Sequence, residues 1–236
     1  MSTGIDLRLE VRGLARVIGR RALVRRVSFE VRSGESVALV GPNGSGKTTL
    51  LSVLAGRQPA DHGSVVLRAG ERALGPAAFR ERVAMLPHDL FVYLDLTAAE
   101  NLAFFAALHG SPGSRVGPVL EAVGLSGHAG AVGRTFSRGM LQRLAAGRLL
   151  ISGAVVWLLD EPSTGLDAPG RRWLADCMAA HVRDGGILIF ASHDRNEVTA
   201  LAHRILVMKD GGIAADLPGG EEGADRAFSF PQARLP

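Results

Sequence analysis

Residues 41–48 read Gly-Pro-Asn-Gly-Ser-Gly-Lys-Thr and fit the phosphate-binding pattern G-x-x-x-x-G-K-[ST]. Glycines at these positions let backbone N–H groups converge on phosphate oxygens. Lys47 brings a positive charge to the β- and γ-phosphates, and the Thr48 hydroxyl is placed to reach Mg²⁺. A plain glycine-rich turn is the alternative, but an apolar run precedes the pattern and a helix is expected from about Lys47. The prediction is a nucleotide and Mg²⁺ site that uses Gly41, Pro42, Asn43, Gly44, Ser45, Gly46, Lys47, Thr48 and Thr49.

Two carboxylates, Asp160 and Glu161, follow the apolar run Ala154–Leu159. Phosphoryl transfer to water needs one group that holds the metal ion and another that polarises the attacking water. We expect Asp160 to hold Mg²⁺ and Glu161 to polarise the water. His193 follows a further apolar run, Ile187–Ala191, and is placed to contact the γ-phosphate. Taken alone, an acidic turn and an incidental histidine are the alternatives; beside a phosphate loop, the catalytic interpretation is favoured.

Four short apolar runs must position these groups: Val37–Val40, Val83–Leu86, Ala154–Leu159 and Ile187–Ala191. None of them alternates with polar residues, as is typical of strands buried on both faces. Strand and helix segments alternate along the chain, which favours an α/β fold with a mostly parallel sheet. Ligands bind such sheets at the carboxyl ends of the strands. The phosphate loop, His88, the two carboxylates and His193 are therefore expected at one edge.

Other segments predict two additions to this core. Leu7–Val11 and Val27–Val31 alternate apolar and polar residues, which indicates an N-terminal antiparallel β subdomain. Helices are predicted at Thr97–His109, Val116–Val123 and Leu141–Leu150, the first with a capping box formed by Thr97 and Glu100. The stretch 218–236 is rich in Gly and Pro and predicts a solvated tail; the alternative is that Phe228 and Phe230 dock it on the core.

Composition limits the function classes. The 236 residues are 47% hydrophobic and 21% charged, which describes a globular chain and excludes disorder. No apolar run approaches the roughly 18 to 20 residues of a spanning helix. The net charge of +4 comes from scattered arginines without a basic block, so nucleic-acid binding is not expected. The N-terminus lacks an export signal and Cys177 is the only cysteine, so a cytoplasmic location is expected.

Between the phosphate loop and the carboxylates, Phe136-Ser137-Arg138-Gly139-Met140 is followed by Gln142-Arg143. This stretch resembles the signature motif of the ATP-binding-cassette (ABC) family of transporter ATPases. Residues 163–167 (Ser-Thr-Gly-Leu-Asp) resemble the D-loop of that family, and His193 resembles its switch histidine. The resemblance covers about residues 5–216.

The resemblance implies a P-loop ATPase fold with one domain over 1–217, in which a helical subdomain at about 88–149 is inserted into a core at about 1–87 and 150–217. It implies Mg²⁺-dependent ATP hydrolysis by two copies bound head to tail, each ATP lying between one phosphate loop and Ser137 and Gly139 of the other copy. It also implies separate membrane-spanning permease subunits, gripped through the helical subdomain and the region 88–100. The chain would then lie on the inner face of the cell membrane.

The chain departs from the family pattern at several positions. Ile18 stands where an aromatic residue commonly stacks on adenine, and His88 stands at the Q-loop glutamine. An imidazole there would make turnover sensitive to pH, which comparison with His88→Gln tests. Arg138 and Met140 replace the commonest signature residues.

The details resemble the haem-exporter type of cytochrome c maturation. Multidrug or antibiotic exporter ATPases, a soluble ABC ATPase and a nucleotide-binding scaffold without turnover are the alternatives.

Overall fold

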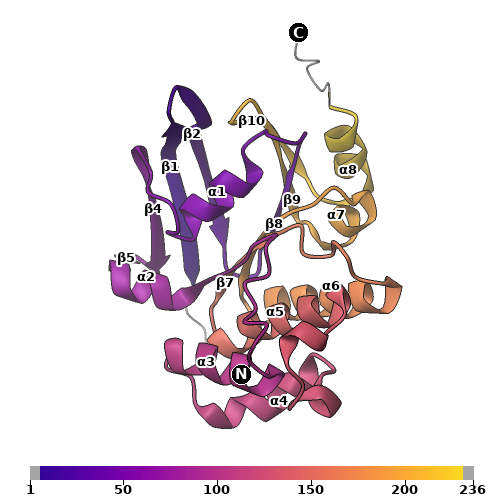
Figure 1. The fold of residues 1–236 in the computed structure, drawn as a ribbon. Coiled ribbons are helices and arrows are strands. Elements are labelled where there is room, and N and C mark those ends of the chain that lie inside the picture. The colour runs from indigo at the N-terminus through magenta and orange to yellow at the C-terminus, as the bar shows by residue number, and fades with distance from the viewer. Residues whose placement is uncertain (1–5, 231–236) are drawn as a thin grey trace.

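The computed structural model describes residues 6–230, which form two β-sheets surrounded by helices (Figure 1). The strands are β1 (Leu7–Ile18), β2 (Arg21–Arg32), β3 (Ser36–Val40), β4 (His62–Ala69), β5 (Arg72–Ala73), β6 (Val83–Leu86), β7 (Val156–Asp160), β8 (Ile187–Ala191), β9 (Arg204–Lys209) and β10 (Gly212–Pro218). The α-helices are α1 (Lys47–Leu54), α2 (Pro76–Arg82), α3 (Ala98–Leu108), α4 (Val116–Ala122), α5 (Arg138–Ser152), α6 (Ala168–Arg183), α7 (Arg195–Leu201) and α8 (Gly220–Phe228). Residues 1–5 of the predicted core and 231–236 of the predicted tail lie outside the described residues.

The larger sheet carries the candidate site. Its strand order is β10-β9-β3-β8-β7-β6; all neighbours pair in parallel except β10, which pairs antiparallel with β9. Every residue of β3, β7 and β8 is buried, as expected for apolar strands without alternation. The four predicted apolar runs are adjacent strands, so their carboxyl ends meet at one edge. The α/β fold predicted from the sequence is confirmed.

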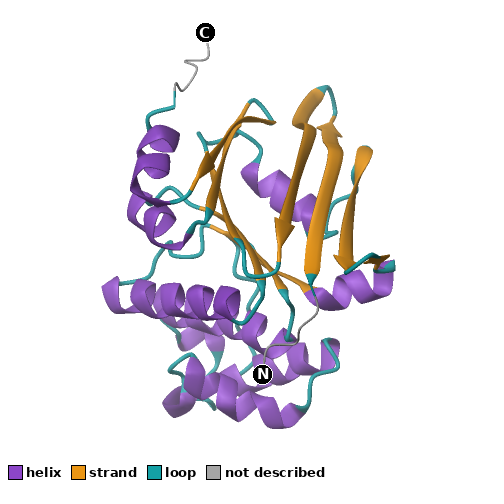
Figure 2. Ribbon diagram, turned by 180° about the vertical axis from the view of Figure 1, so that it is seen from behind, coloured by secondary structure: helices purple, strands orange, loops and turns teal. Residues whose placement is uncertain are grey.

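The smaller sheet, in the order β2-β1-β4-β5, is antiparallel throughout, which confirms the antiparallel pairing predicted for the early segments. Helix α1 lies between the two sheets (Figure 2). Leucines of α1 share one apolar core with the inward residues of β1, β2, β3, β7 and β8. This packing fixes α1, and with it the phosphate loop, against the carboxyl ends of the parallel strands.

A helical layer formed by α3, α4 and α5 covers one end of the molecule (Figures 1 and 2). Helix α3 begins with the predicted capping box, because the Thr97 side chain accepts from the Glu100 N–H and the Glu100 carboxylate accepts from the Thr97 N–H. Helix α5 is longer than predicted at both ends. It starts at Arg138 because the Ser137 hydroxyl caps the Met140 N–H.

The predicted solvated tail is wrong for residues 220–228, which form α8. Ala224 and Ala227 of α8 are buried, and Phe228 and Phe230 pack against the core that lies behind the parallel sheet. The docking alternative is the one the structure bears out. Among residues 6–230, no helix combines the length and the apolar character that crossing a bilayer demands.

Candidate active site

The phosphate loop wraps around the ammonium group of Lys47. Lys47 Nζ donates to the carbonyls of Gly41 (2.8 Å) and Pro42 (3.1 Å), and the residue is only 6% exposed. Burial lowers the pKa of Lys47, while the charges of Glu161 and Asp160 oppose that shift. The ammonium is therefore held at the centre of the loop beside two carboxylates.

Two positions of the loop, 41 and 46, require glycine because the backbone has a positive φ and because backbone atoms of other strands lie too close for a Cβ. Gly41 has φ +155°, and a Cβ there would lie 2.2 Å from the Met208 carbonyl oxygen. Gly46 has φ +104°, and a Cβ there would lie 2.3 Å from the Leu23 carbonyl oxygen. Any side chain at these two positions would collide with the Met208 or Leu23 carbonyl, so the observed shape of the loop requires glycine there.

Asp160 is the last residue of β7 and is 3% exposed. Burial raises the pKa of its carboxyl, and a hydrogen bond from the Thr48 side chain opposes the shift. Asp160 Oδ2 is buried and has no hydrogen-bond partner among the described residues. An unsatisfied carboxylate oxygen beside a hydroxyl fits Mg²⁺, which prefers oxygen ligands and completes its shell with water and phosphate. No cluster of three or more His, Cys, Asp or Glu suited to a metal occurs within residues 6–230.

Glu161 and His193 are in direct contact, with 2.7 Å between Glu161 Oε1 and His193 Nε2. Glu161 has a left-handed backbone, φ +53°, which is unfavourable for a side chain that carries a Cβ. Its N–H donates to the Ala191 carbonyl at 3.0 Å, and this bond ties the loop after β7 to the end of β8. The left-handed backbone of Glu161 and its contact with His193 occur where the adjacent strands β7 and β8 end, at the sheet edge predicted from the sequence.

A cavity of about 260 Å³ joins the phosphate loop to Glu161. Its lining consists of Arg21, Leu23, Asn43, Gly44, Gly46, Lys47, Thr48, Thr49 and Glu161. A second cavity of about 220 Å³ lies on the other side of Glu161, and His88, Arg138 and Gln142 are among its lining residues. The structure thus brings together Lys47, Thr48, Asp160, Glu161, His193 and His88 at one sheet edge.

None of the predicted site residues outside the phosphate loop and the ends of β6, β7 and β8 lines the phosphate-loop cavity. Ile18 is exposed at the end of β1 and does not line the cavity. Ser137 and Gly139, at the start of α5, do not line it either. Ser137 is exposed, and its hydroxyl accepts from the Met140 N–H of the same chain.

Sequence reasoning missed Glu197, a half-buried carboxylate in the first turn of α7. Glu197 accepts from the Ser163 hydroxyl and, at 2.5 Å, from the Ser192 hydroxyl, and burial raises the pKa of its carboxyl. The residue therefore bridges the loop after β7 and the loop after β8. An acidic residue in the first turn of a helix ordinarily stabilises that helix. Glu197 therefore gave no sequence signal for a role in the candidate site.

A second missed contact comes from Gln142, on α5. Its side-chain amide donates to the Pro162 carbonyl at 2.5 Å, next to Glu161. This bond ties α5 to the loop that carries Glu161.

Comparison with known proteins supplies the family. A family model described as ABC transporter matches residues 24–164 of the chain. The chain belongs to the ABC transporter family. The family resemblance stated from the sequence is confirmed, and with it the P-loop fold and the assignment as an ATP-binding ATPase domain.

Relatives of this ABC protein carry names that refer to different transport roles. The cytochrome c biogenesis ATP-binding export protein CcmA of Cereibacter sphaeroides is 36% identical over 226 residues, covering 94% of this chain and 97% of the relative. The linearmycin resistance ATP-binding protein LnrL of Bacillus subtilis is 31% identical over 211 residues, covering 88% of this chain and 68% of the relative. A solved structure of an ATP-binding subunit of an ABC transporter matches with TM-score 0.80 at 26% identity, covering 89% of each chain.

Proposed function

We propose that this ABC protein hydrolyses Mg²⁺-bound ATP at the edge formed by β3, β7 and β8, with Glu161 as the general base. The Glu161–His193 pair carries the proposal, because it places a carboxylate and a hydrogen-bonded imidazole beside the phosphate loop. Glu161 accepts a proton from the attacking water, and His193 holds Glu161 in place and contacts the γ-phosphate. Lys47 exchanges its carbonyl partners for the β- and γ-phosphate oxygens.

Thr48 and Asp160 are the residues that hold Mg²⁺ in this proposal. The ion supplies charge neutralisation between the β- and γ-phosphates when it is bound. The buried, unpartnered Asp160 Oδ2 supports the assignment, since a carboxylate oxygen without a donor is costly unless a ligand satisfies it.

A second copy of the chain completes the site in this proposal. Ser137 caps and Gly139 belongs to the first turn of a 15-residue helix, and Ser137 is exposed and does not line the phosphate-loop cavity of its own chain. Free N–H groups at a helix start favour phosphate binding. We assign that phosphate to the ATP held by the phosphate loop of the partner copy, in the head-to-tail arrangement.

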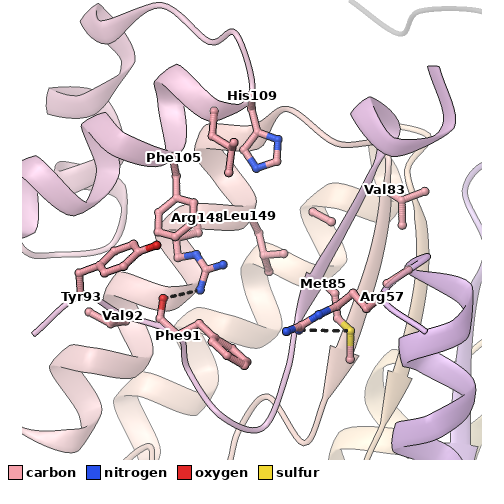
Figure 3. Close-up of a pocket in the computed structure, with 13 residues that line it drawn as sticks. Arg57, Val83, Met85, Phe91, Val92, Tyr93, Phe105, His109, Arg148 and Leu149 are labelled. Atoms are coloured by element: carbon pink, nitrogen blue, oxygen red, sulfur yellow. Dashed lines mark hydrogen bonds between the residues drawn. The ribbon is translucent and has the colours of Figure 1, made fainter. Parts of the chain in front are cut away.

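The surface for a membrane-spanning permease subunit is assigned to a cavity of about 540 Å³ between β6 and the helical layer (Figure 3). Phe91, Tyr93 and Leu108 line it and are about half exposed or more, which is unusual for large apolar side chains. An apolar segment of the permease that reaches past the membrane surface would cover them. With this contact, we propose that the ATPase lies at the inner face of the membrane.

The same cavity is cationic. Within residues 6–230, its lining includes Arg57 and Arg148 and no Asp or Glu. The Arg148 guanidinium lies 3.9 Å from the centre of the Phe105 ring and donates to the Phe91 carbonyl (Figure 3). Burial lowers the pKa of Arg148 to about 10, and the charge of Arg57 adds to the shift. We therefore expect the permease segment to bring an acidic side chain as well as apolar ones.

For the transported cargo we propose haem, in export that serves cytochrome c maturation. The match to a cytochrome c biogenesis export protein over nearly the full length of both chains supports this choice. Antibiotic export is the second candidate, and the match to the linearmycin resistance protein supports it over a smaller share of the relative.

The partner and cargo proposals are tested by purifying a Glu161→Gln variant with ATP from native membranes. Blocked hydrolysis should hold the closed assembly, so mass spectrometry should identify multi-span subunits, and an absorbance scan should detect haem. Arg57→Glu should reduce recovery of those subunits, because it reverses a charge in the cavity. The matched control is Arg183→Glu, an exposed arginine at the end of α6. Recovery of soluble partners alone would overturn the transporter assignment.

A further inference from the structure

The C-terminal helix α8 is fitted tightly against the back of the candidate site. It packs on α7, β9 and β10. A Cβ at Gly219 would lie 1.8 Å from the Ala202 carbonyl oxygen, and a Cβ at Gly223 would lie 1.8 Å from the Pro218 carbonyl oxygen. These distances leave no room for any side chain, so α8 occupies one defined position rather than lying loosely on the surface.

The end of α8 reaches both the phosphate loop and the switch histidine. A gap of about 60 Å³ is lined jointly by Gly41 and Pro42 of the phosphate loop, by His193, and by Phe228 and Phe230. Both phenylalanines are half-buried in this contact. The two aromatic side chains therefore form one wall of the space beside His193, and the first residues of the phosphate loop form another.

A second link joins α8 to the segment that carries His193. Arg195, two residues after the histidine, donates through Nε to Asp225 Oδ1 at 2.6 Å, and its second terminal nitrogen lies 2.5 Å from the same oxygen. Glu221 of α8 lies 3.8 Å from Arg195. An exposed ion pair contributes little to the free energy of folding, but two charge-assisted contacts between Arg195 and Asp225 tie the start of α7 to α8.

We propose that residues 220–230 position His193, by fixing the loop 192–194 against the phosphate loop so that His193 keeps its hydrogen bond to Glu161. Phe230 and Asp225 are positioning residues; neither touches the cavity that joins the phosphate loop to Glu161. The proposal rests on the role in ATP hydrolysis proposed for His193. It predicts that a change at the end of α8 alters turnover and leaves nucleotide binding intact.

The test measures ATP hydrolysis by the full chain with Phe230→Ala, Phe230→Leu and, as control, Glu222→Ala. Glu222 is exposed on α8, the helix that precedes Phe230. Phe230→Ala should lower kcat about fivefold or more with KM for ATP within about twofold, because a misplaced catalytic group costs turnover rather than binding. Phe230→Leu should recover most of the rate, and Glu222→Ala should match the wild type. A wild-type kcat for Phe230→Ala would overturn the proposal.

Two further measurements separate this proposal from the role of His193 itself. In a His193→Ala background, Phe230→Ala should cause no additional loss of kcat; an equal loss in both backgrounds would overturn the proposal. Hydrogen exchange at residues 190–194 should quicken in Phe230→Ala and not in Glu222→Ala, whatever the activity. A normal kcat for His193→Ala would overturn the role of His193 and this positioning role together. A defective His193→Ala beside a normal Phe230→Ala would overturn the positioning role alone.

Discussion

Burial of His181 makes the stability of the core depend on pH. The imidazole stacks on Trp157, with ring centres 3.9 Å apart and planes 8° from parallel, and Nε2 lies 3.2 Å from the Ile187 carbonyl oxygen. Burial lowers the pKa of His181 from 6.5 to about 4. The folded protein therefore keeps the ring neutral at pH values where the unfolded chain protonates it.

The sign and size follow from that difference. Between pH 6.5 and 4 the unfolded state binds more protons, so the free energy of unfolding falls as the pH falls. With the ring neutral in the folded state, the loss attributable to His181 is about 2 kcal/mol at pH 5 and about 3 kcal/mol at pH 4. Above pH 6.5 the contribution is fully present.

The assay compares the wild type with His181→Phe, which keeps an aromatic ring against Trp157 and cannot titrate. Denaturant unfolding followed by tryptophan fluorescence at pH 7 and pH 5 gives the free energy of unfolding of each protein. The wild type should lose about 2 kcal/mol more than the variant over this interval. Equal losses in the two proteins would refute the reasoning, because the remaining carboxylates and histidines are common to both.

Three other perturbations have defined outcomes. Thr97→Ala removes the capping box of α3 and should lower the free energy of unfolding by about 1 kcal/mol, measured by denaturant titration; no change would mean that the cap bonds are not formed in solution. Burial raises the pKa of the Cys177 thiol to about 11, so at pH 8 a thiol reagent should modify Cys177 about 100-fold more slowly than it modifies a thiol of pKa 9. Equal reaction rates for the two thiols would contradict the burial of Cys177. Gly46→Ala should abolish ATP binding in a fluorescent-nucleotide titration, because its Cβ would lie 2.3 Å from the Leu23 carbonyl oxygen; retained binding would show that the loop can move.

The parallel core could be predicted from the sequence because strands that are buried on both faces consist almost entirely of apolar residues. Strands without polar alternation, each followed by a reactive side chain, had to place those side chains at one sheet edge. The contact between Glu161 and His193 follows from β7 and β8 being neighbours in that sheet.

The sequence failed where long-range packing outweighs local composition. Gly219 and Gly220 suggested a flexible end, yet Gly219 and Gly223 are small because other backbone segments approach them closely. The spacing of Gly223, Ala224 and Ala227 places small residues on one face of a helix. In a segment this short and preceded by two glycines, that spacing is too weak to predict a buried helix. Glu197 was missed for a related reason, since its two hydroxyl partners come from different loops.

ATP hydrolysis by Glu161→Gln tests the central claim most directly. The substitution keeps the shape of the side chain and removes the base, so kcat should fall about 100-fold or more while ATP binding persists. Glu121→Gln, an exposed position on α4, serves as the matched control and should keep the wild-type rate. A wild-type kcat for Glu161→Gln would contradict the role of Glu161 as the general base.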